Sequence, residues 1–503
     1  MTDLANLGTP AARSRRPVPS WAVLVIACMA QFMVVLDISI VNVALPAMKH
    51  SLDLSSTAQQ WIVNAYTLTF GGFLLLGGRA ADLFGRKKVF IIGLALFTLA
   101  SVAGGFAQSG GMLIAARAVQ GLGGAILAPA TLSLLTTTYT EPKERTRALT
   151  AWGATAASGG AFGAVLGGVL TQAFDWRWVL FVNVPIGIVL LIAAVRSLTE
   201  SRGTLSGLRS LDLPGAITVT TGLAALVYAI VTTDTYSWGS AHTLVLLAVA
   251  AVLLVTFGII ESRVKHPLVP LRIFASRSLS GANAIALLLG AVLTAFIFFM
   301  SLFIQQVNGY SPLQAGLALL PATLGSLAAS LIAGKLVGRV GPRTLLTVGP
   351  LVGAGGLLWM AQLSPGDGYL VHILVPSILV GLGLATCFVP MTMAGTGGVP
   401  VRDAGLASGL INTSRQVGAA IGLAGLATLA ITRTDHVLAG HHAGPTLTGV
   451  ALTSGYDQAF LYGAGVAVLM ALIAAVIIPK FATQQADTAV EAEALEMVAL
   501  EGA

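Results

Sequence analysis

The segment GGRAADLFGRKK, at residues 77–88, separates two long apolar stretches and guides the interpretation of the whole chain. It contains four bases, one acid and three glycines, a composition that cannot lie in lipid, so it must form a tight aqueous connection between two membrane helices. Gly78 and Gly85 permit a close turn. Asp82 can accept hydrogen bonds from helix N-terminal amides or from Arg86, which predicts a held turn; the alternative is a plain basic loop that only sets orientation.

The composition of the whole chain agrees with a membrane protein. Of its 503 residues, 56% are hydrophobic and 9% are charged, whereas a soluble domain has about 25% charged residues. At about 20 residues per crossing, the apolar stretches predict fourteen spanning helices. Their expected bounds are 21–45, 60–78, 89–107, 111–137, 148–173, 178–196, 212–233, 241–261, 279–305, 314–337, 344–362, 371–394, 405–431 and 457–479.

The distribution of basic residues predicts the orientation of the chain. With the N-terminus inside, 22 of the 27 Lys and Arg residues fall in cytoplasmic segments, and the even number of helices places both termini there. The net charge of +7 follows from this bias. Because the bases are scattered over short loops without interleaved aromatic residues, they do not indicate nucleic-acid binding. We expect a multi-pass protein of the plasma membrane.

A second polar turn, GKLVGRVGPR at residues 334–343, predicts an internal duplication. It lacks the aspartate of the first turn but repeats its spacing at Gly334, Gly338, Arg339, Gly341 and Arg343. The fold class that follows is an all-α polytopic membrane protein with two pseudo-symmetric six-helix bundles and two inserted helices. The expected divisions are a disordered cytoplasmic arm at 1–20, bundles at 21–196 and 279–479, the inserted helices with their loops at 197–278, and a cytoplasmic tail at 480–503.

Asp37 lies well inside the first apolar stretch, in QFMVVLDISIVNVALP. A carboxylate there costs about 2.5–3.5 kcal/mol on insertion scales, so it must face a wet cavity, find a partner, or be protonated part of the time. These requirements make Asp37 a candidate functional residue. The alternative is a structural acid that bridges helices.

Arg117 and Gln120 lie in the apolar stretch GMLIAARAVQGLGGAILAPA. Arginine cannot lose its proton, so burial of Arg117 requires an acceptor or water. A functional partner is one interpretation, and a carbonyl at a helix end is the other.

These motifs resemble those of the major facilitator superfamily. The positions of its signature turn between helices 2 and 3 are occupied by Gly78, Asp82, Gly85, Arg86 and Lys87. The stretch from Leu36 to Pro46 also resembles the helix 1 motif of its fourteen-helix drug:proton antiporter branch. The resemblance spans nearly the whole chain. It implies alternating access, a proton site at Asp37 tuned by Arg117 and Gln120, and a latch formed by the 77–88 turn.

Gly159, Gly163 and Gly167 recur every four residues in the expected fifth helix and so lie on one stripe. Such a stripe lets another helix approach closely, and it matches the antiporter motif of the family, in which it would seal the outer side. That motif has a proline after the glycine at position 163, where this chain has Ala164. The departure removes a local kink that the proline would supply.

Several polar or adaptable side chains are candidates for a substrate cavity. All but Asn42 have a structural alternative. Tyr66 also suits an interfacial belt, Phe298 suits lipid or core contacts, and the polar group of the thirteenth helix suits interhelical hydrogen bonds. The full candidate set is Asn42, Tyr66, Phe298, Asn412, Arg415 and Gln416.

The chain lacks the motifs of an ATP-driven or catalytic membrane protein. No GxxxxGK[ST] loop, catalytic Ser/His/Asp set or metal-ligand cluster occurs, so we expect neither an enzyme nor a bound metal or cofactor. The family resemblance implies a monomeric proton-coupled exporter of amphipathic drugs, in contact with lipid. The Gly- and Ala-rich composition of the chain resembles that of proteins from actinobacteria. In those organisms, exporters of this kind give self-resistance to puromycin-like or lincomycin-like compounds. The alternatives are export of an endogenous metabolite or siderophore, import, and a sensor or assembly partner without transport.

Overall fold

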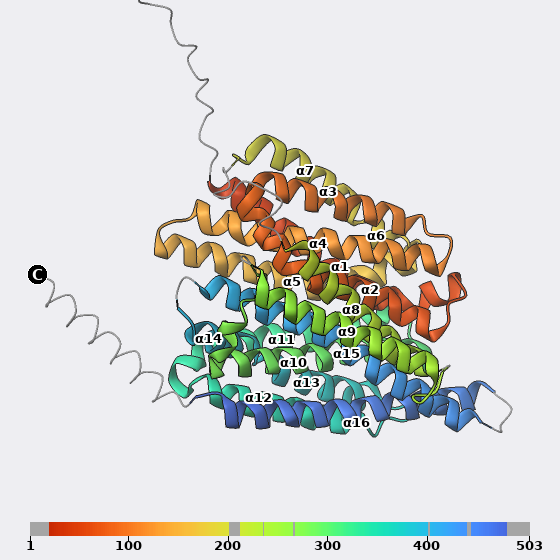
Figure 1. Ribbon diagram of the computed structural model, residues 1–503. Helices are drawn as coiled ribbons and strands as arrows, with labels where there is room; N and C mark the ends of the chain where they lie inside the picture. Colours follow the sequence, from red (N-terminus) through yellow and green to blue (C-terminus); the bar gives the residue numbers. More distant parts are fainter. Residues whose placement is uncertain are drawn as a thin grey trace, which may run out of the picture.

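The computed structural model describes residues 20–200, 212–234, 236–264, 267–400, 403–439 and 444–479, which form a bundle of helices running side by side (Figure 1). The expected cytoplasmic arm and tail therefore lie outside the described residues, except for Ser20, where the first helix begins. We call the end of the bundle that holds Ser20 and Ile477 the terminal end, and the other the opposite end.

The first half of the bundle contains six spans, the last of which is made by two consecutive helices. Its elements are α1 (Ser20–Ser51), α2 (Ser56–Phe84), α3 (Arg86–Gly105), α4 (Gly110–Thr138), α5 (Pro142–Ala173), α6 (Trp178–Phe181) and α7 (Asn183–Ser197). Within it, α1 packs on α5, and α4 packs on both α2 and α3.

The second half also has six spans, two of which include a π-helical turn. Its elements are α10 (Arg277–Leu302) with η4 (Phe303–Val307), α11 (Pro312–Val340), α12 (Pro342–Met360), η5 (Tyr369–Leu374) with α13 (Val375–Ala385) and α14 (Phe388–Gly397), α15 (Ala404–Leu438) and α16 (Pro445–Ile477). Here α10 packs on α15, and α12 packs on α16 and α13.

Two further spans form a hairpin between the halves. The hairpin consists of α8 (Leu213–Val231), η2 (Thr232–Asp234) and α9 (Ala241–Arg263), and η3 (Leu271–Ala275) follows it. In Figure 1 this pair lies across the boundary between the first half above and the second half below. Helix α8 contacts both α2 and α15, so the hairpin touches each half.

The fourteen expected spans are present. Thirteen described segments are long and apolar enough to cross a membrane, and α12, with 19 residues packed among α13 and α16, completes the set. The expected loop between residues 432 and 456 is largely helical, because α15 continues to Leu438 and α16 begins at Pro445. Hydropathy marks only the part of a helix in lipid, whereas the helix itself can continue into water.

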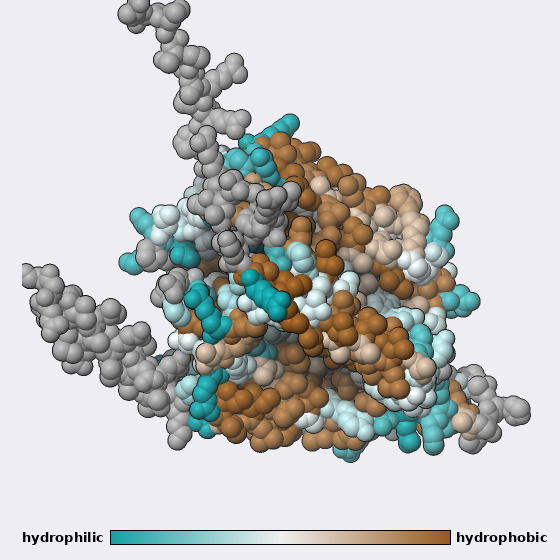
Figure 2. Space-filling view, viewed as in Figure 1, coloured by the Kyte–Doolittle hydropathy of each residue, from teal (hydrophilic) through white to brown (hydrophobic). Residues whose placement is uncertain are grey.

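The surface has the pattern of a membrane protein. Figure 2 shows hydrophobic side chains along the lengths of the helices and hydrophilic ones at the two ends of the bundle. Helix α9 illustrates this, since its exposed side chains include Leu244, Val245, Val249, Val252, Val255 and Ile259. These residues are placed to contact lipid.

The two polar turns have the same backbone geometry, which supports the duplication. Gly85 (φ 97°) joins α2 to α3, and Gly341 (φ 79°) joins α11 to α12. In the first turn, Lys87 Nζ donates to the carbonyl oxygens of Val195 and Leu198, at 2.8 and 2.6 Å. In the second, Arg343 donates to the carbonyl of Ala475. Each turn thus directs a cation to the C-terminal carbonyls of the last helix in its own half, where the helix dipole favours positive charge.

Candidate functional site

Asp37 lies near the middle of α1 and is completely buried, with 0% of its surface exposed. Its carboxylate accepts three hydrogen bonds from side chains of two other helices. Oδ2 accepts from Arg117 Nη1 at 2.6 Å, and Oδ1 accepts from Gln120 Nε2 at 2.7 Å and Asn183 Nδ2 at 2.9 Å. A membrane carboxylate was expected to face a wet cavity, to find a partner, or to be protonated part of the time. In the structure, Asp37 has partners.

Arg117 connects this carboxylate to α2. Arg117 is buried, with 2% of its surface exposed. Its guanidinium also donates to Gln120 Oε1 at 2.6 Å and to the carbonyl oxygen of Ile62 at 3.3 Å. Its Cζ lies 4.4 Å from the ring centroid of Tyr66, a cation–π contact. The expected contact with a helix carbonyl is thus present, but it accompanies an ion pair instead of replacing it.

Tyr66 belongs to this buried network and not to an interfacial belt. It is buried and stacks on Phe70, with ring centroids 5.8 Å apart. Its hydroxyl has no hydrogen-bond partner among the described residues. Tyr66 therefore supplies Arg117 with an aromatic face from α2.

Two members of the network, Asn183 and Ser101, were not anticipated from the sequence. Asn183 begins α7 and reaches Asp37, and Ser101 of α3 accepts from Gln120 Nε2 at 2.8 Å. Both are fully buried. The isolated amide in the apolar stretch from Trp178 to Ala194 was the signal available for Asn183. Neutral polar residues occur often as interhelical contacts, so this signal is weaker than that of a charge.

The glycine stripe places α5 against the part of α1 that carries Asp37. A side-chain carbon at Gly159 would lie 3.0 Å from the carbonyl oxygen of Phe32, and one at Gly163 would lie 2.8 Å from that of Leu36. At Gly167 the same atom would lie 2.7 Å from the carbonyl oxygen of Ile40. The stripe therefore lies between two helices of the first half, α5 and α1, which approach closely along it. Its expected role in sealing the outer side stays a prediction.

The contact between α5 and the second half uses the neighbouring face of α5. A side-chain carbon at Gly168 would lie 2.5 Å from the carbonyl oxygen of Pro312, and one at Gly316 would lie 2.3 Å from that of Ala164. Ala164, which stands where the family motif has proline, is therefore part of the α5–α11 contact. This contact is at the opposite end of the bundle.

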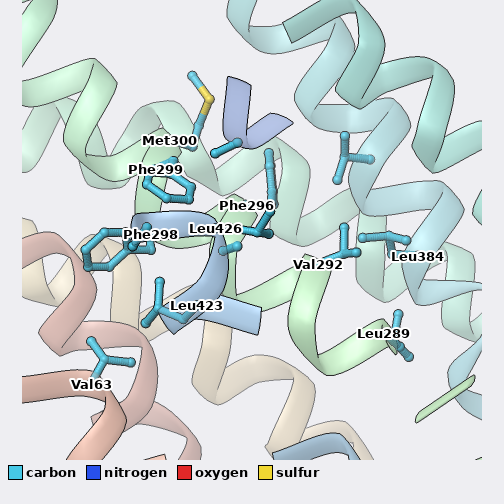
Figure 3. Close-up of a cluster of buried hydrophobic side chains, with 14 of the residues drawn as sticks. Val63, Leu289, Val292, Phe296, Phe298, Phe299, Met300, Leu384, Leu423 and Leu426 are labelled. Atoms are coloured by element: carbon cyan, nitrogen blue, oxygen red, sulfur yellow. The ribbon is translucent and has the colours of Figure 1, made fainter. Parts of the chain in front are cut away.

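Further contacts close the two halves at that end. Ser301 Oγ donates to the carbonyl of Asn42 at 3.0 Å, and Gln305 Nε2 donates to that of Val43 at 3.0 Å. Phe298 belongs, with Val63 of α2 and Leu423 of α15, to one buried apolar cluster (Figure 3). The structure therefore represents a conformation that is closed at the opposite end.

Of the other candidate cavity residues, Asn42 lies on α1, and Asn412, Arg415 and Gln416 lie on α15. Asn42 donates to the carbonyl of Ile38 in its own helix at 2.8 Å, and its amide oxygen has no partner among the described residues. Arg415 Nη2 donates to Asn412 Oδ1 at 2.8 Å. Gln416 packs against Gly71 of α2, whose lack of a side chain lets the two halves approach closely. These polar groups thus provide contacts within α15 and beside the junction of the halves.

The described side chains of the 77–88 turn bind helices of the first half. Arg86 Nε donates to Ser133 of α4 at 2.6 Å, and Lys87 caps α7 as described above. A side-chain carbon at Gly77 would lie 2.2 Å from the carbonyl oxygen of Ala125, so α2 and α4 meet backbone to backbone here. The side chain of Asp82 lies outside the described part of the structure, and its expected role stays a prediction.

A cavity of about 370 Å³ lies apart from this network, at the terminal end. Its lining comes from η3 and the connection between α14 and α15, and it includes Arg272 and Asp403 but not Asp37. We therefore take the buried polar network, which this cavity does not include, as the candidate functional site.

Comparison with known proteins decides the family. The family model of the Major Facilitator Superfamily matches residues 27–423. The chain belongs to the major facilitator superfamily. It is 39% identical over 489 residues to the puromycin resistance protein pur8 of Streptomyces alboniger, with 96% of each chain covered. It is 43% identical over 453 residues to the cephamycin export protein CmcT of Amycolatopsis lactamdurans, with 90% of each covered.

Solved structures agree with this membership at the level of the fold. A bacterial homologue of the human lysosomal transporter Spinster, in an inward-facing and unoccupied conformation, superposes with a TM-score of 0.65 at 16% identity, covering 91% of this chain and 96% of that one. The peptide transporter POT gives a TM-score of 0.64 at 16% identity, covering 92% and 94%. The chain is thus a multi-pass membrane protein of a transporter family, as the motifs predicted.

Proposed function

We propose that this protein exports amphipathic antibiotics from the cell in exchange for protons. The functions of two relatives, puromycin resistance and cephamycin export, support the substrate class. The observation that carries proton coupling is the buried ion pair between Asp37 and Arg117.

Asp37 can hold either Arg117 or a proton at its Oδ2 atom. A bound proton would neutralise the carboxylate and turn that oxygen from an acceptor into a donor, so the 2.6 Å bond to Arg117 would be lost. Arg117 would then shift against its other contacts, Ile62 and Tyr66 of α2. Because α2 packs on α15, protonation would act on the junction of the two halves.

The proposed cycle is alternating access. In the conformation closed at the opposite end, substrate would enter between the halves from the terminal end and move towards the middle of the bundle. The residues proposed to contact it there are Asn42, Tyr66, Phe298, Asn412, Arg415 and Gln416. The 77–88 turn would then latch the terminal end closed. Moving one elementary charge across 100 mV supplies about 2.3 kcal/mol, enough to bias such a cycle.

We assign the terminal end to the cytoplasm of the cell, with both termini inside, a monomeric state, and no enzymatic activity. The excess of Lys and Arg in the segments at this end supports the orientation. We also propose the divisions expected from the sequence, with bundles at 21–196 and 279–479 and the inserted helices with their loops at 197–278.

The decisive experiment uses the full chain in proteoliposomes. Proton movement is recorded after addition of puromycin, a cephamycin or lincomycin, for the wild type and for Asp37→Asn. We expect at least one compound to move protons in the wild type and none in the variant. The matched control is Glu144→Gln, which removes an exposed acid at the start of α5 and should leave coupling unchanged.

Two outcomes would contradict the proposal in different ways. If coupling survives in Asp37→Asn, another residue carries the proton and the site assignment is wrong. If no compound moves protons in the wild type, the antibiotic assignment gives way to a metabolite exporter or a protein without transport.

A further inference from the structure

The inserted hairpin carries two buried acids at its terminal end, away from the Asp37 network. Asp212 caps α8, and its Oδ1 atom accepts from the backbone N–H of Gly215 at 2.8 Å. Glu261 lies in the last turn of α9, and its Oε2 atom accepts from the backbone N–H of Val269 at 2.9 Å. Each residue is only 3% exposed.

One oxygen of each acid lacks a hydrogen-bond partner in the described part of the chain, although the backbone N–H of Leu268 also lies near Glu261. Asp212 Oδ2 and Glu261 Oε1 are buried and have no hydrogen-bond partner among the described residues. The two side chains nevertheless lie within hydrogen-bonding reach of one another. Two ionised carboxylates this close and this buried repel one another, whereas one proton between them would give both unpartnered oxygens a bond.

The bond from Val269 to Glu261 ties the hairpin to the second half. Leu268 and Val269 are buried, and Ile273 of η3 follows them into the apolar cluster that includes α10 and α15. The bases near this point, Arg263 and Arg272, are exposed. The connecting residues Lys265 and His266 lie outside the described part of the chain.

We propose that Asp212 and Glu261 form a second proton-binding site, and that their shared proton holds the α8–α9 hairpin to the segment that enters the second half. Loss of the proton leaves two adjacent buried negative charges, which repel and draw in water. Glu261 then separates from Asp212, and the 267–276 segment loses its anchor at Val269. The hairpin is thereby a pH-sensitive strap between the halves, independent of the role proposed for Asp37.

Hydrogen exchange of the intact protein tests this inference. Backbone protection of the peptide covering residues 267–276 is measured from acidic to alkaline pH in the wild type, Glu261→Gln and the control Glu144→Gln, and the variants are compared at each pH. Glutamine keeps an oxygen for Val269 and offers an N–H to Asp212, so it mimics the protonated pair. We expect the wild type and the control to lose protection with rising pH, and Glu261→Gln to retain it.

Each other outcome would overturn the inference. Identical pH profiles for the wild type and Glu261→Gln would show that no proton is shared there. Disappearance of the pH dependence in His266→Ala would assign the titration to the histidine instead. Disappearance in Asp37→Asn would show that the peptide reports the first proton site, because the inference requires this variant to behave as the wild type does.

Discussion

The two halves of the bundle share a scaffold but differ in their buried chemistry. Both have a polar turn with a glycine at positive φ, and both direct a cation from that turn to the end of their last helix. The first half encloses an ion pair at Asp37 and Arg117, whereas α10 has no charged residue after Arg277 and instead contributes Phe296, Phe298 and Phe299 to an apolar cluster. Duplication has thus preserved the parts that hold helices together, while the buried ion pair seen among the described residues lies in the first half.

The largest expected effect tests the charged core of the first half. Arg117→Ala leaves the Asp37 carboxylate buried without its cation, which should destabilise the protein by about 3–5 kcal/mol. Thermal unfolding of the purified protein in detergent measures this. The double variant Asp37→Asn with Arg117→Ala should recover much of the loss, because no uncompensated charge remains. Additive losses in the double variant would mean that the pair contributes nothing as a pair.

The glycine stripe provides the next comparison, between two positions on one helix. Gly163→Val should displace α1 from α5, since even the first side-chain carbon would lie 2.6 Å from Cβ of Ser39. Overpacking of this kind costs about 1–3 kcal/mol and would disturb the position of Asp37. Gly160→Ala is the control, because its nearest neighbour atom lies 3.9 Å away. We expect only Gly163→Val to lower both the unfolding temperature and substrate-driven proton movement.

Asn183 tests whether the network extends beyond the residues that carry charge. Asn183→Leu removes one of the three donors to Asp37 and should cost about 1–3 kcal/mol, less than the loss of Arg117. Because Asp37 is then held by two donors instead of three, substrate-driven proton movement should also fall. Unchanged proton movement with lowered stability would limit Asn183 to a structural role.

The sequence predicted the spans from hydropathy and two members of the network from their charge. Asp37 and Arg117 are costly in lipid, so each required a partner, and the structure pairs them. Gln120, which was expected from the family resemblance alone, bonds to both. Neutral Asn183 and Ser101 carry no such requirement, and no spacing relates residues 37 and 183 along the chain. The glycine stripe predicted close packing but could not name its partner, since a small residue admits any helix. Only the folded arrangement shows that α1 receives the stripe and α11 the adjacent face.

The smallest expected effect returns to the two turns, where the halves are most alike. Lys87→Ala and Arg343→Ala each remove a cation from the C-terminal carbonyls of a helix, a contact worth about 0.3–1 kcal/mol when exposed. If the turns are equivalent braces, the two variants should lower the unfolding temperature by similar small amounts, and Lys87→Arg should restore the first. The first turn alone lies in the half with the Asp37 network and is the one proposed to act as a latch. A loss of transport in Lys87→Ala but not in Arg343→Ala, at equal stability, would therefore separate the latch from the brace. Equal transport in both would show that Lys87 only holds α7 in place.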